Sequence, residues 1–166
     1  YRSEPIVLDR PILITGATGF IGRHLAQQLC ANGDADRVRC LVRPSSDVGE
    51  LEQLGVELVH GDVTDWDGLR AAMEGCGQVV HLANLYSFWE PDPSVYRRIN
   101  VEGTRLTAQA AIEAGVDLFL HVSTVATFGR PAEVPFNEDS QPGPKRFSEY
   151  AQTKFEGDEI VEALAQ

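Results

Sequence analysis

The chain has 166 residues, a formal net charge of −11, 43% hydrophobic residues and 23% charged residues. This length predicts one domain with an ordinary buried core, and this composition is typical of a globular rather than a disordered chain. Because the chain is so acidic and has no cluster of basic residues, we expect it to bind neither nucleic acid nor an anionic membrane surface.

The predicted elements begin with a strand, a tight turn and a helix. Residues 1–10 are a polar lead-in, and Ile12 to Ile14 form a continuous apolar run that is typical of a buried strand. Apolar residues then recur at helical spacing over residues 20–29, and Gly33 follows where a helix would end. The first 33 residues therefore predict the order strand, turn, helix.

Three glycines, Gly16, Gly19 and Gly22, lie in and just after this turn. The N–H groups of a first helical turn lack partners within the helix, and the helix dipole favours an anion beside them. Glycines let the backbone turn sharply and approach a pyrophosphate, and Gly22 would let the helix pack closely on the strand. The turn is therefore a candidate phosphate-binding site.

The rest of the chain alternates between strands and helices. Further strands are expected at 37–42, 56–60, 78–83 and 117–122. Helices are expected from a cap at Ser46 or Asp47 to Leu54, from a cap at Thr64 or Asp65 past Met73, over 94–114 and from Phe147 onward, with an irregular segment at 123–145. This alternation predicts a parallel sheet with helices on both faces and a ligand beyond the carboxyl ends of its strands.

Cysteine and histidine spacing argues against the common sites built from these residues. The three cysteines are odd in number and lack C-x-x-C spacing, so we expect neither a disulfide framework nor a zinc site. His60, His81 and His121 lie near the ends of predicted strands, and we interpret them as buried or half-buried structural side chains. Without a membrane-length apolar run or a signal-peptide pattern, a reducing cytoplasm is the expected compartment.

Residues 11–22, PILITGATGFIG, resemble the extended branch of the short-chain dehydrogenase/reductase superfamily. That branch holds nucleotide-sugar epimerases and dehydratases, dihydroflavonol reductases and 3β-hydroxysteroid dehydrogenases. The resemblance implies that residues 11–166 form an α/β domain, a three-layer αβα Rossmann-type, doubly wound parallel sheet. It implies that a nicotinamide dinucleotide contacts Gly16, Thr18, Gly19, Phe20, Ile21 and Gly22.

Three further segments resemble cofactor-binding positions of this family. Asp62 resembles the aspartate that accepts a hydrogen bond from the adenine amino group, with Val63 beside the ring. The segment Leu82-Ala83-Asn84 resembles the one that lines the adenine ribose and the pyrophosphate, although the family often has a small residue at the position of Asn84. Asn100 in NVEGT resembles an asparagine that supports the fourth strand and the cofactor more than the chemistry.

Arg43 follows the second predicted strand, where the adenosine ribose of the cofactor would lie. An acidic residue there typically binds the 2′-hydroxyl of NAD, whereas an arginine suits the 2′-phosphate of NADP. We therefore favour NADP(H) as the cofactor, with Ser45 or Ser46 and Arg23 as additional contacts, and keep NAD(H) as the alternative.

Tyr150 and Lys154 resemble the catalytic pair of the superfamily. At positions i and i+4 of a helix the phenol and the ammonium share one face. A phenol has a pKa near 10, so a neighbouring lysine that favours the phenolate would help it to exchange a proton at neutral pH. The resemblance also implies that Lys154 holds the hydroxyls of the nicotinamide ribose.

The segment 122–129, VSTVATFG, resembles the stretch that supplies the third catalytic partner. Its alignment on Gly129 assigns that role to Thr124, with Ser123 as the fallback. The hydroxyl would hold the substrate oxygen and stabilise the charge that develops there. The implied reaction passes hydride between the nicotinamide and a substrate carbon, while Tyr150 carries the proton to or from the substrate oxygen.

Three functions stay open, and we favour the first. An NAD(P)-dependent oxidoreductase acting on an alcohol or ketone fits Arg43 and the apolar, aromatic segment 85–89, which includes Phe88. A nucleotide-sugar epimerase or dehydratase with tightly bound NAD is the alternative. A non-catalytic NADP(H) sensor on the same fold is a third reading, against which the intact Tyr150 and Lys154 weigh.

The resemblance covers nearly the whole chain from Pro11 onward, but the sequence stops within the helix that carries Tyr150. Extended members continue with another strand and a C-terminal substrate region. We therefore expect the chain to be the N-terminal portion of a longer protein that acts on a small-molecule substrate. The identity of that substrate would depend mostly on the missing C-terminal region. The family's dimers use a four-helix bundle, which makes a homodimer possible but leaves it unproven.

Overall fold

The computed structural model describes residues 9–87 and 89–165, so the lead-in at 1–8 and Phe88 lie outside the described residues. Five parallel strands form one sheet in the order β3-β2-β1-β4-β5. Their bounds are β1 Ile12–Thr15, β2 Val38–Val42, β3 Glu57–His60, β4 Gln78–His81 and β5 Leu118–His121. The strand order reverses at β1. The loops that follow β1 and β4 therefore run in opposite directions, and a crevice lies between them.

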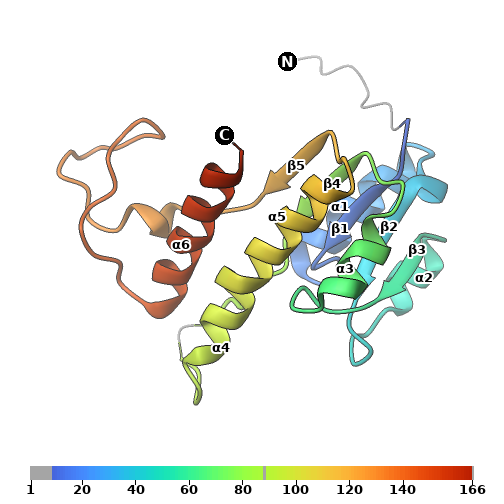
Figure 1. Cartoon of the computed structure of the whole chain (residues 1–166), viewed down its shortest axis with the longest axis horizontal. Coiled ribbons are helices and arrows are strands. Elements are labelled where there is room, and N and C mark those ends of the chain that lie inside the picture. Colours follow the sequence, from blue (N-terminus) through green and yellow to red (C-terminus); the bar gives the residue numbers. More distant parts are fainter. Residues whose placement is uncertain (1–8, 88, 166) are drawn as a thin grey trace.

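Helices cover both faces of this sheet, which confirms the predicted three-layer fold (Figure 1). The helices are α1 Phe20–Ala31, α2 Gly49–Gln53, α3 Trp66–Met73, α4 Ser94–Tyr96, α5 Thr104–Glu113 and α6 Glu149–Leu164. Short 3₁₀ helices, η1 Ala35–Arg37 and η3 Val125–Phe128, and a π-helical stretch, η2 Arg97–Gly103, complete the elements. Helix α6 lies beside α5 and packs against η2 and α5.

The alternation of side chains along β1 divides the core into two halves. Ile12 and Ile14 lie in the cluster beneath α1 and α2, whereas Leu13 lies in the cluster beneath α3 and α5. All three are buried, because both faces of a parallel sheet are covered by helices. The continuous apolar run in the sequence is the consequence of this two-sided burial.

The helix predicted over residues 94–114 is present, but its second segment, η2, is π-helical. Asn100 lies in this segment and is 1% exposed. Its Oδ1 accepts a hydrogen bond from Leu85 N at 2.7 Å, and its Nδ2 donates to Thr153 Oγ1 at 3.1 Å. The wide turn thus carries a side chain that ties the loop after β4 to α6.

Several predicted boundaries move because side chains take over backbone hydrogen bonds. Strand β4 ends at His81 rather than at residue 83, since Ala83 N donates to Thr15 Oγ1 instead of to a strand. Helix α6 begins at Glu149 rather than Phe147, because Ser148 Oγ caps it by accepting from Ala151 N at 3.1 Å.

Two other local predictions need correction. Asp65 occupies the cap position of α3, but its side chain makes no capping hydrogen bond. His60 is exposed at the end of the edge strand β3 and is not a buried structural histidine, because no further strand covers it in the described residues. His81 and His121 do lie inside the fold.

His81 is the polar centre of the core. Thr104 gives its hydroxyl proton to Asn100 O, so its oxygen accepts from His81 Nε2 at 3.1 Å. Thr15 Oγ1 accepts from Ala83 N and lies 2.8 Å from His81 Nδ1, to which it donates. This network assigns the neutral imidazole with its proton on Nε2. Burial lowers the pKa of His81 well below its usual value, and the nearby His121 and Lys154 add to this.

Acidification is therefore expected to destabilise the chain through His81. The folded-state pKa of His81 is depressed, so the unfolded chain takes up the proton first. The stabilising contribution is complete above about pH 6.5 and falls below it, by about 1.4 kcal/mol per pH unit for one proton. Urea unfolding at pH 7.5 and 5.5 measures this loss. If His81→Gln lost as much unfolding free energy between pH 7.5 and 5.5, the loss could not be assigned to His81.

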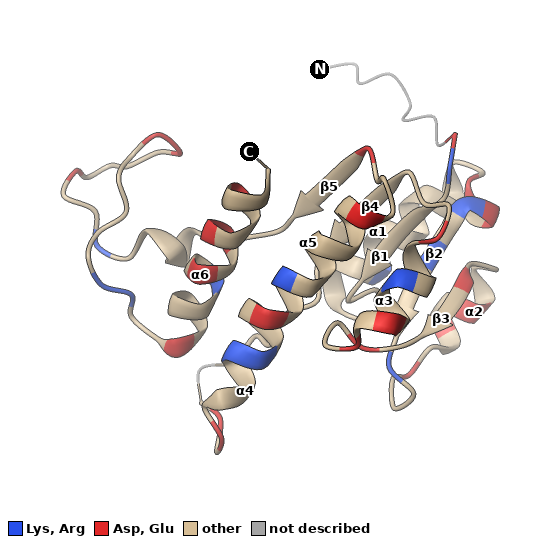
Figure 2. Cartoon of the chain, viewed as in Figure 1, with Lys and Arg blue, Asp and Glu red and all other residues tan. Residues whose placement is uncertain are grey.

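Charged residues are spread along the helices and loops, with single Lys and Arg positions among the acidic ones (Figure 2). The excess of 25 acidic over 14 basic residues gives the net charge of −11. Within the described residues, every helix is too short or too polar to cross a bilayer. No group of three or more His, Cys, Asp or Glu side chains there is arranged to hold a metal ion.

Candidate active site

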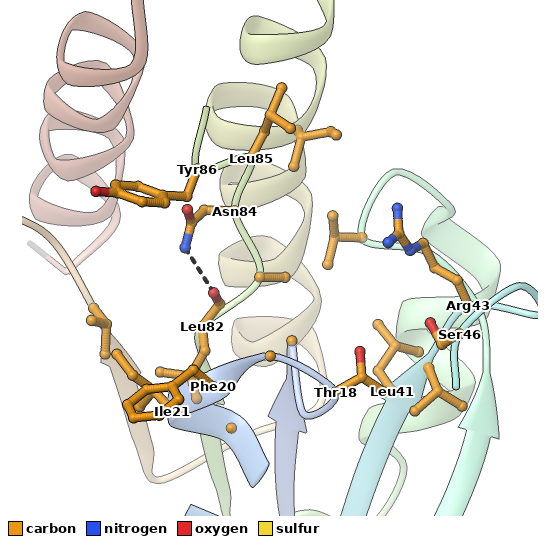
Figure 3. A pocket seen from close by; sticks show the side chains of 18 of the residues that line it. Thr18, Phe20, Ile21, Leu41, Arg43, Ser46, Leu82, Asn84, Leu85 and Tyr86 are labelled. Carbon is orange, nitrogen blue, oxygen red and sulfur yellow. Dashed lines mark hydrogen bonds between the residues drawn. The ribbon is translucent and has the colours of Figure 1, made fainter. Parts of the chain in front are cut away.

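A cavity of about 620 Å³ lies at the carboxyl ends of the strands (Figure 3). The loops after β1, β2, β3, β4 and β5 contribute its walls, and α6 contributes Tyr150. All predicted catalytic and cofactor-binding residues line it except Asn100, Lys154 and the additional contacts Arg23 and Ser45. Those that line it are Gly16, Thr18, Gly19, Phe20, Ile21, Gly22, Arg43, Ser46, Asp62, Val63, Leu82, Ala83, Asn84, Ser123, Thr124 and Tyr150.

The turn between β1 and α1 forms the floor of the cavity and has no room for side chains at two positions. Gly16 has φ +70°, and a Cβ there would lie 2.7 Å from Ala83 N. A Cβ on Gly22 would lie 2.6 Å from Ala17 Cα. Gly19 caps α1 without a side chain, and the first turn carries no acidic residue. The amino end of this 12-residue helix is thus left to bind an external anion.

Arg43 lines the side of the cavity opposite Tyr86, beside Ser46 (Figure 3). It is exposed, and its carbonyl accepts from Ser46 N at 2.9 Å in the tight turn that follows β2. Arg23, which is predicted from the sequence as an additional contact to the 2′-phosphate, instead forms an ion pair with Glu50 at 3.1 Å. Of the candidate 2′-phosphate contacts, Arg43 and Ser46 line the cavity.

Asp62 lies after β3 and is half-buried. Its Oδ1 accepts from Thr64 N at 2.9 Å and from Thr64 Oγ1 at 2.7 Å. These two bonds fix the carboxylate against its own turn, which leaves Oδ2 available to a ligand. Asn84, across the cavity, is exposed and donates from Nδ2 to Leu82 O at 2.9 Å (Figure 3).

Thr124 and Tyr150 meet at the end of the cavity opposite Arg43. Burial raises the pKa of Tyr150, and its hydrogen bond with the Thr124 hydroxyl acts in the opposite direction. Tyr86 packs edge-to-face on the Tyr150 ring with centroids 5.1 Å apart. Tyr150 is 8% exposed, so the phenol is enclosed by protein yet still lines the cavity.

Lys154 lies one turn behind Tyr150 and is 3% exposed. Its Nζ donates to Val122 O at 2.8 Å, at the end of β5. The sequence predicts that Lys154 lowers the pKa of Tyr150, but here that pKa is raised, because the phenol is desolvated and the nearby Tyr86 and Asp158 add to this. Burial also lowers the pKa of Lys154, while Asp158 opposes that change.

The two candidate hydroxyls after β5 have different partners. Thr124 bonds to Tyr150, whereas Ser123 Oγ donates to Asp158 Oδ2 at 2.5 Å. The extended backbone of Thr124 (φ −151°, ψ 146°) turns successive side chains to opposite sides, which separates the two roles.

Sequence reasoning missed Tyr86, His121 and Asp158. Tyr86 lies in the aromatic segment that was assigned only a loose preference for apolar substrates, and its ring faces α6 (Figure 3). Asp158 lies four residues after Lys154, on the same helical face, and this spacing is the signal that could have found it. No local pattern marks His121, because its partners come from another element.

Known proteins share this fold. Residues 12–166 match the model of a family described as the NAD dependent epimerase/dehydratase family. A Synechocystis protein named "Putative dihydroflavonol 4-reductase" is 35% identical over 155 residues, which are 92% of this chain and 44% of that protein.

Two solved structures are similar over the same region. WbmG of Bordetella bronchiseptica in complex with NAD has a TM-score of 0.80 and 30% identity, covering 93% of this chain and 49% of that one. DesIV of Streptomyces venezuelae, a dTDP-glucose 4,6-dehydratase with NAD bound, has a TM-score of 0.82 and 30% identity, covering 92% and 51%. The chain thus spans about half the length of these relatives.

Proposed function

The chain belongs to the NAD dependent epimerase/dehydratase family, and from that premise we propose that it is the cofactor-binding part of an NAD(P)-dependent oxidoreductase. The reaction that we propose transfers hydride between a nicotinamide cofactor and the carbon of an alcohol or ketone. The hydrogen bond between Thr124 and Tyr150, at the wall of the cavity that begins at the glycine turn, is the observation that carries this proposal.

A nicotinamide dinucleotide fits the residues that line the cavity. A Cβ at Gly16 or Gly22 would clash with neighbouring backbone, so the turn needs glycine at both positions, and the uncapped amino end of α1 suits a pyrophosphate. Oδ2 of Asp62 is available to an adenine amino group, and Arg43 with Ser46 suits a ribose 2′-phosphate.

The proposed mechanism assigns one task to each side chain around Tyr150. When bound, the nicotinamide cofactor supplies or accepts the hydride. The Tyr150 phenol gives a proton to the substrate oxygen during reduction and takes it back during oxidation. Thr124 donates a hydrogen bond to the same oxygen and stabilises the negative charge that develops on it. The Lys154 ammonium supplies positive charge behind the phenol and holds the end of β5.

Cofactor choice tests the proposal, and Arg43→Ala is the decisive change. We expect the unmodified chain to bind NADPH more tightly than NADH, because a guanidinium pairs with the 2′-phosphate. Loss of that charge-assisted contact should weaken NADPH binding about 10- to 100-fold, or about 1.4–2.7 kcal/mol, and leave NADH binding unchanged. Fluorescence titration with both cofactors measures the constants.

Arg70→Ala is the matched control, because it removes the same charge from an exposed arginine of α3 that pairs with Glu113 away from the cavity. It should leave both constants unchanged. Equal binding of the two cofactors, or a preference for NADH, would count against NADP(H) and favour the second candidate function.

That second candidate is a nucleotide-sugar epimerase or dehydratase with tightly bound NAD. It is favoured by the family description and by the NAD bound to WbmG and DesIV. The two candidates differ in the fate of the cofactor, since a reductase releases it changed and an epimerase or dehydratase regenerates it. Absorbance at 340 nm during turnover separates net oxidation of NADPH from a reaction without net cofactor change.

A further inference from the structure

A second polar cluster lies behind the Thr124–Tyr150 pair, at the end of β5. Asp158 of α6 uses both carboxylate oxygens there. Oδ1 lies 3.1 Å from His121 Nε2, and Oδ2 accepts the Ser123 hydroxyl proton at 2.5 Å. The cluster joins the last residue of β5, the chain that follows it and the helix that carries Tyr150.

The surroundings of His121 determine where its proton lies. Nε2 is 3.1 Å from Asp158 Oδ1 and 3.4 Å from Lys154 Nζ, and it cannot donate to the first and accept from the second at once. Nδ1 is buried and has no hydrogen-bond partner among the described residues. A proton on Nδ1 would be a buried unsatisfied donor, so the favourable tautomer carries the proton on Nε2 and donates it to Asp158.

Lys154 then depends on Asp158 for its charge balance. Its ammonium donates to Val122 O, and a carbonyl alone does not offset the desolvation of a buried cation. Asp158 is the carboxylate that acts on Lys154 from the next helical turn. The other titratable groups that face the cluster are His81 of β4, stacked on His121 with centroids 5.6 Å apart, and Tyr150.

We propose that Asp158, with the His121 imidazole it orients, is a positioning residue that holds Lys154 and Ser123 at the end of β5 and so keeps Thr124 and Tyr150 aimed at the cavity. The inference rests on the proposed function for its effect on turnover, but its structural core can be tested without turnover. The Ser123 hydroxyl is thereby engaged on the helix side, and Thr124 is left to serve the substrate oxygen.

Two spectroscopic measurements on this chain test the cluster directly. In the unmodified chain, ¹⁵N shifts of His121 should identify the neutral tautomer with its proton on Nε2. In Asp158→Asn, the Tyr150 and Lys154 titrations should both move to lower pH, because a negative charge that raises both pKa values is gone. The displacement should be larger for Lys154, on which Asp158 acts second only to burial, than for Tyr150, on which Asp158 has the smallest influence.

The phenol titration is read at 295 nm as the difference from Tyr150→Phe. Asp158→Glu should return the two titrations close to those of the unmodified chain. Glu159→Gln, at the next and exposed position of α6, should leave both titrations unchanged. A proton on Nδ1 of His121, or unchanged titrations in a folded Asp158→Asn, would overturn the inference. If Asp158→Asn does not fold, the tautomer measurement on the unmodified chain decides.

In the longer protein expected to contain this chain, the alkaline limb of the kcat profile should move to lower pH in Asp158→Asn. A uniform loss at every pH would indicate a purely structural role and overturn the inference. If the unmodified protein shows no turnover but the titrations shift as expected, the proposed function is refuted and the role of Asp158 in the cluster is retained.

Discussion

Tyr150→Phe is expected to lower kcat of the longer protein about 10²- to 10⁴-fold, since the phenol is the proposed proton carrier. The substitution removes one oxygen and keeps the ring that packs on Tyr86, so the fold and cofactor binding should be retained. Steady-state turnover and cofactor titration on the same preparation measure the two effects separately.

Tyr96→Phe provides the matched control. Tyr96 is 2% exposed, and its hydroxyl donates to Ser87 O at 3.0 Å outside the residues that line the cavity. It should change kcat less than about threefold, because a neutral hydrogen bond contributes about 1 kcal/mol to stability and nothing to proton transfer. Full turnover in Tyr150→Phe would refute the proton-carrier role, and cofactor binding without any turnover in the unmodified protein would favour a sensor.

Gly22→Ala is expected to have the second large effect, on folding and on cofactor binding together. The new Cβ would lie 2.6 Å from Ala17 Cα and 3.0 Å from Ala17 C, and both are backbone atoms of the turn. Because neither atom can move without displacing α1 from β1, the cost should reach about 3 kcal/mol or more. Urea unfolding and cofactor titration should report the two losses.

Gly49→Ala tests whether this effect belongs to the site or to glycine in a helix. A Cβ on Gly49, at the start of α2, would lie 3.6 Å from Asp47 Oδ1, which is an ordinary contact. That variant should be neutral or more stable by up to about 1 kcal/mol, since alanine loses less entropy on folding. A stable, cofactor-binding Gly22→Ala would show that the helix and the strand are not in close contact at this turn.

Elements whose signals are local can be predicted from the amino-acid sequence. The apolar run Ile12 to Ile14, the glycines and the helical spacing after them predict β1, its turn and α1, because strand and helix periodicity depends on neighbouring residues alone. The same holds for the parallel, two-faced sheet, which follows from alternating strands and helices. The spacing of Tyr150 and Lys154 likewise assigns them to one face of α6.

Which side chains meet depends on how separate elements pack in the folded chain. Thr124 and Ser123 are neighbours in sequence, yet one bonds to Tyr150 and the other to Asp158, since the backbone of β5 and the docking of α6 set their directions. The raised pKa of Tyr150 and the binding of Lys154 to Val122 O depend on burial and on contacts across about 30 positions of chain. Sequence periodicity carries no information on such contacts, because they form only when separate elements pack.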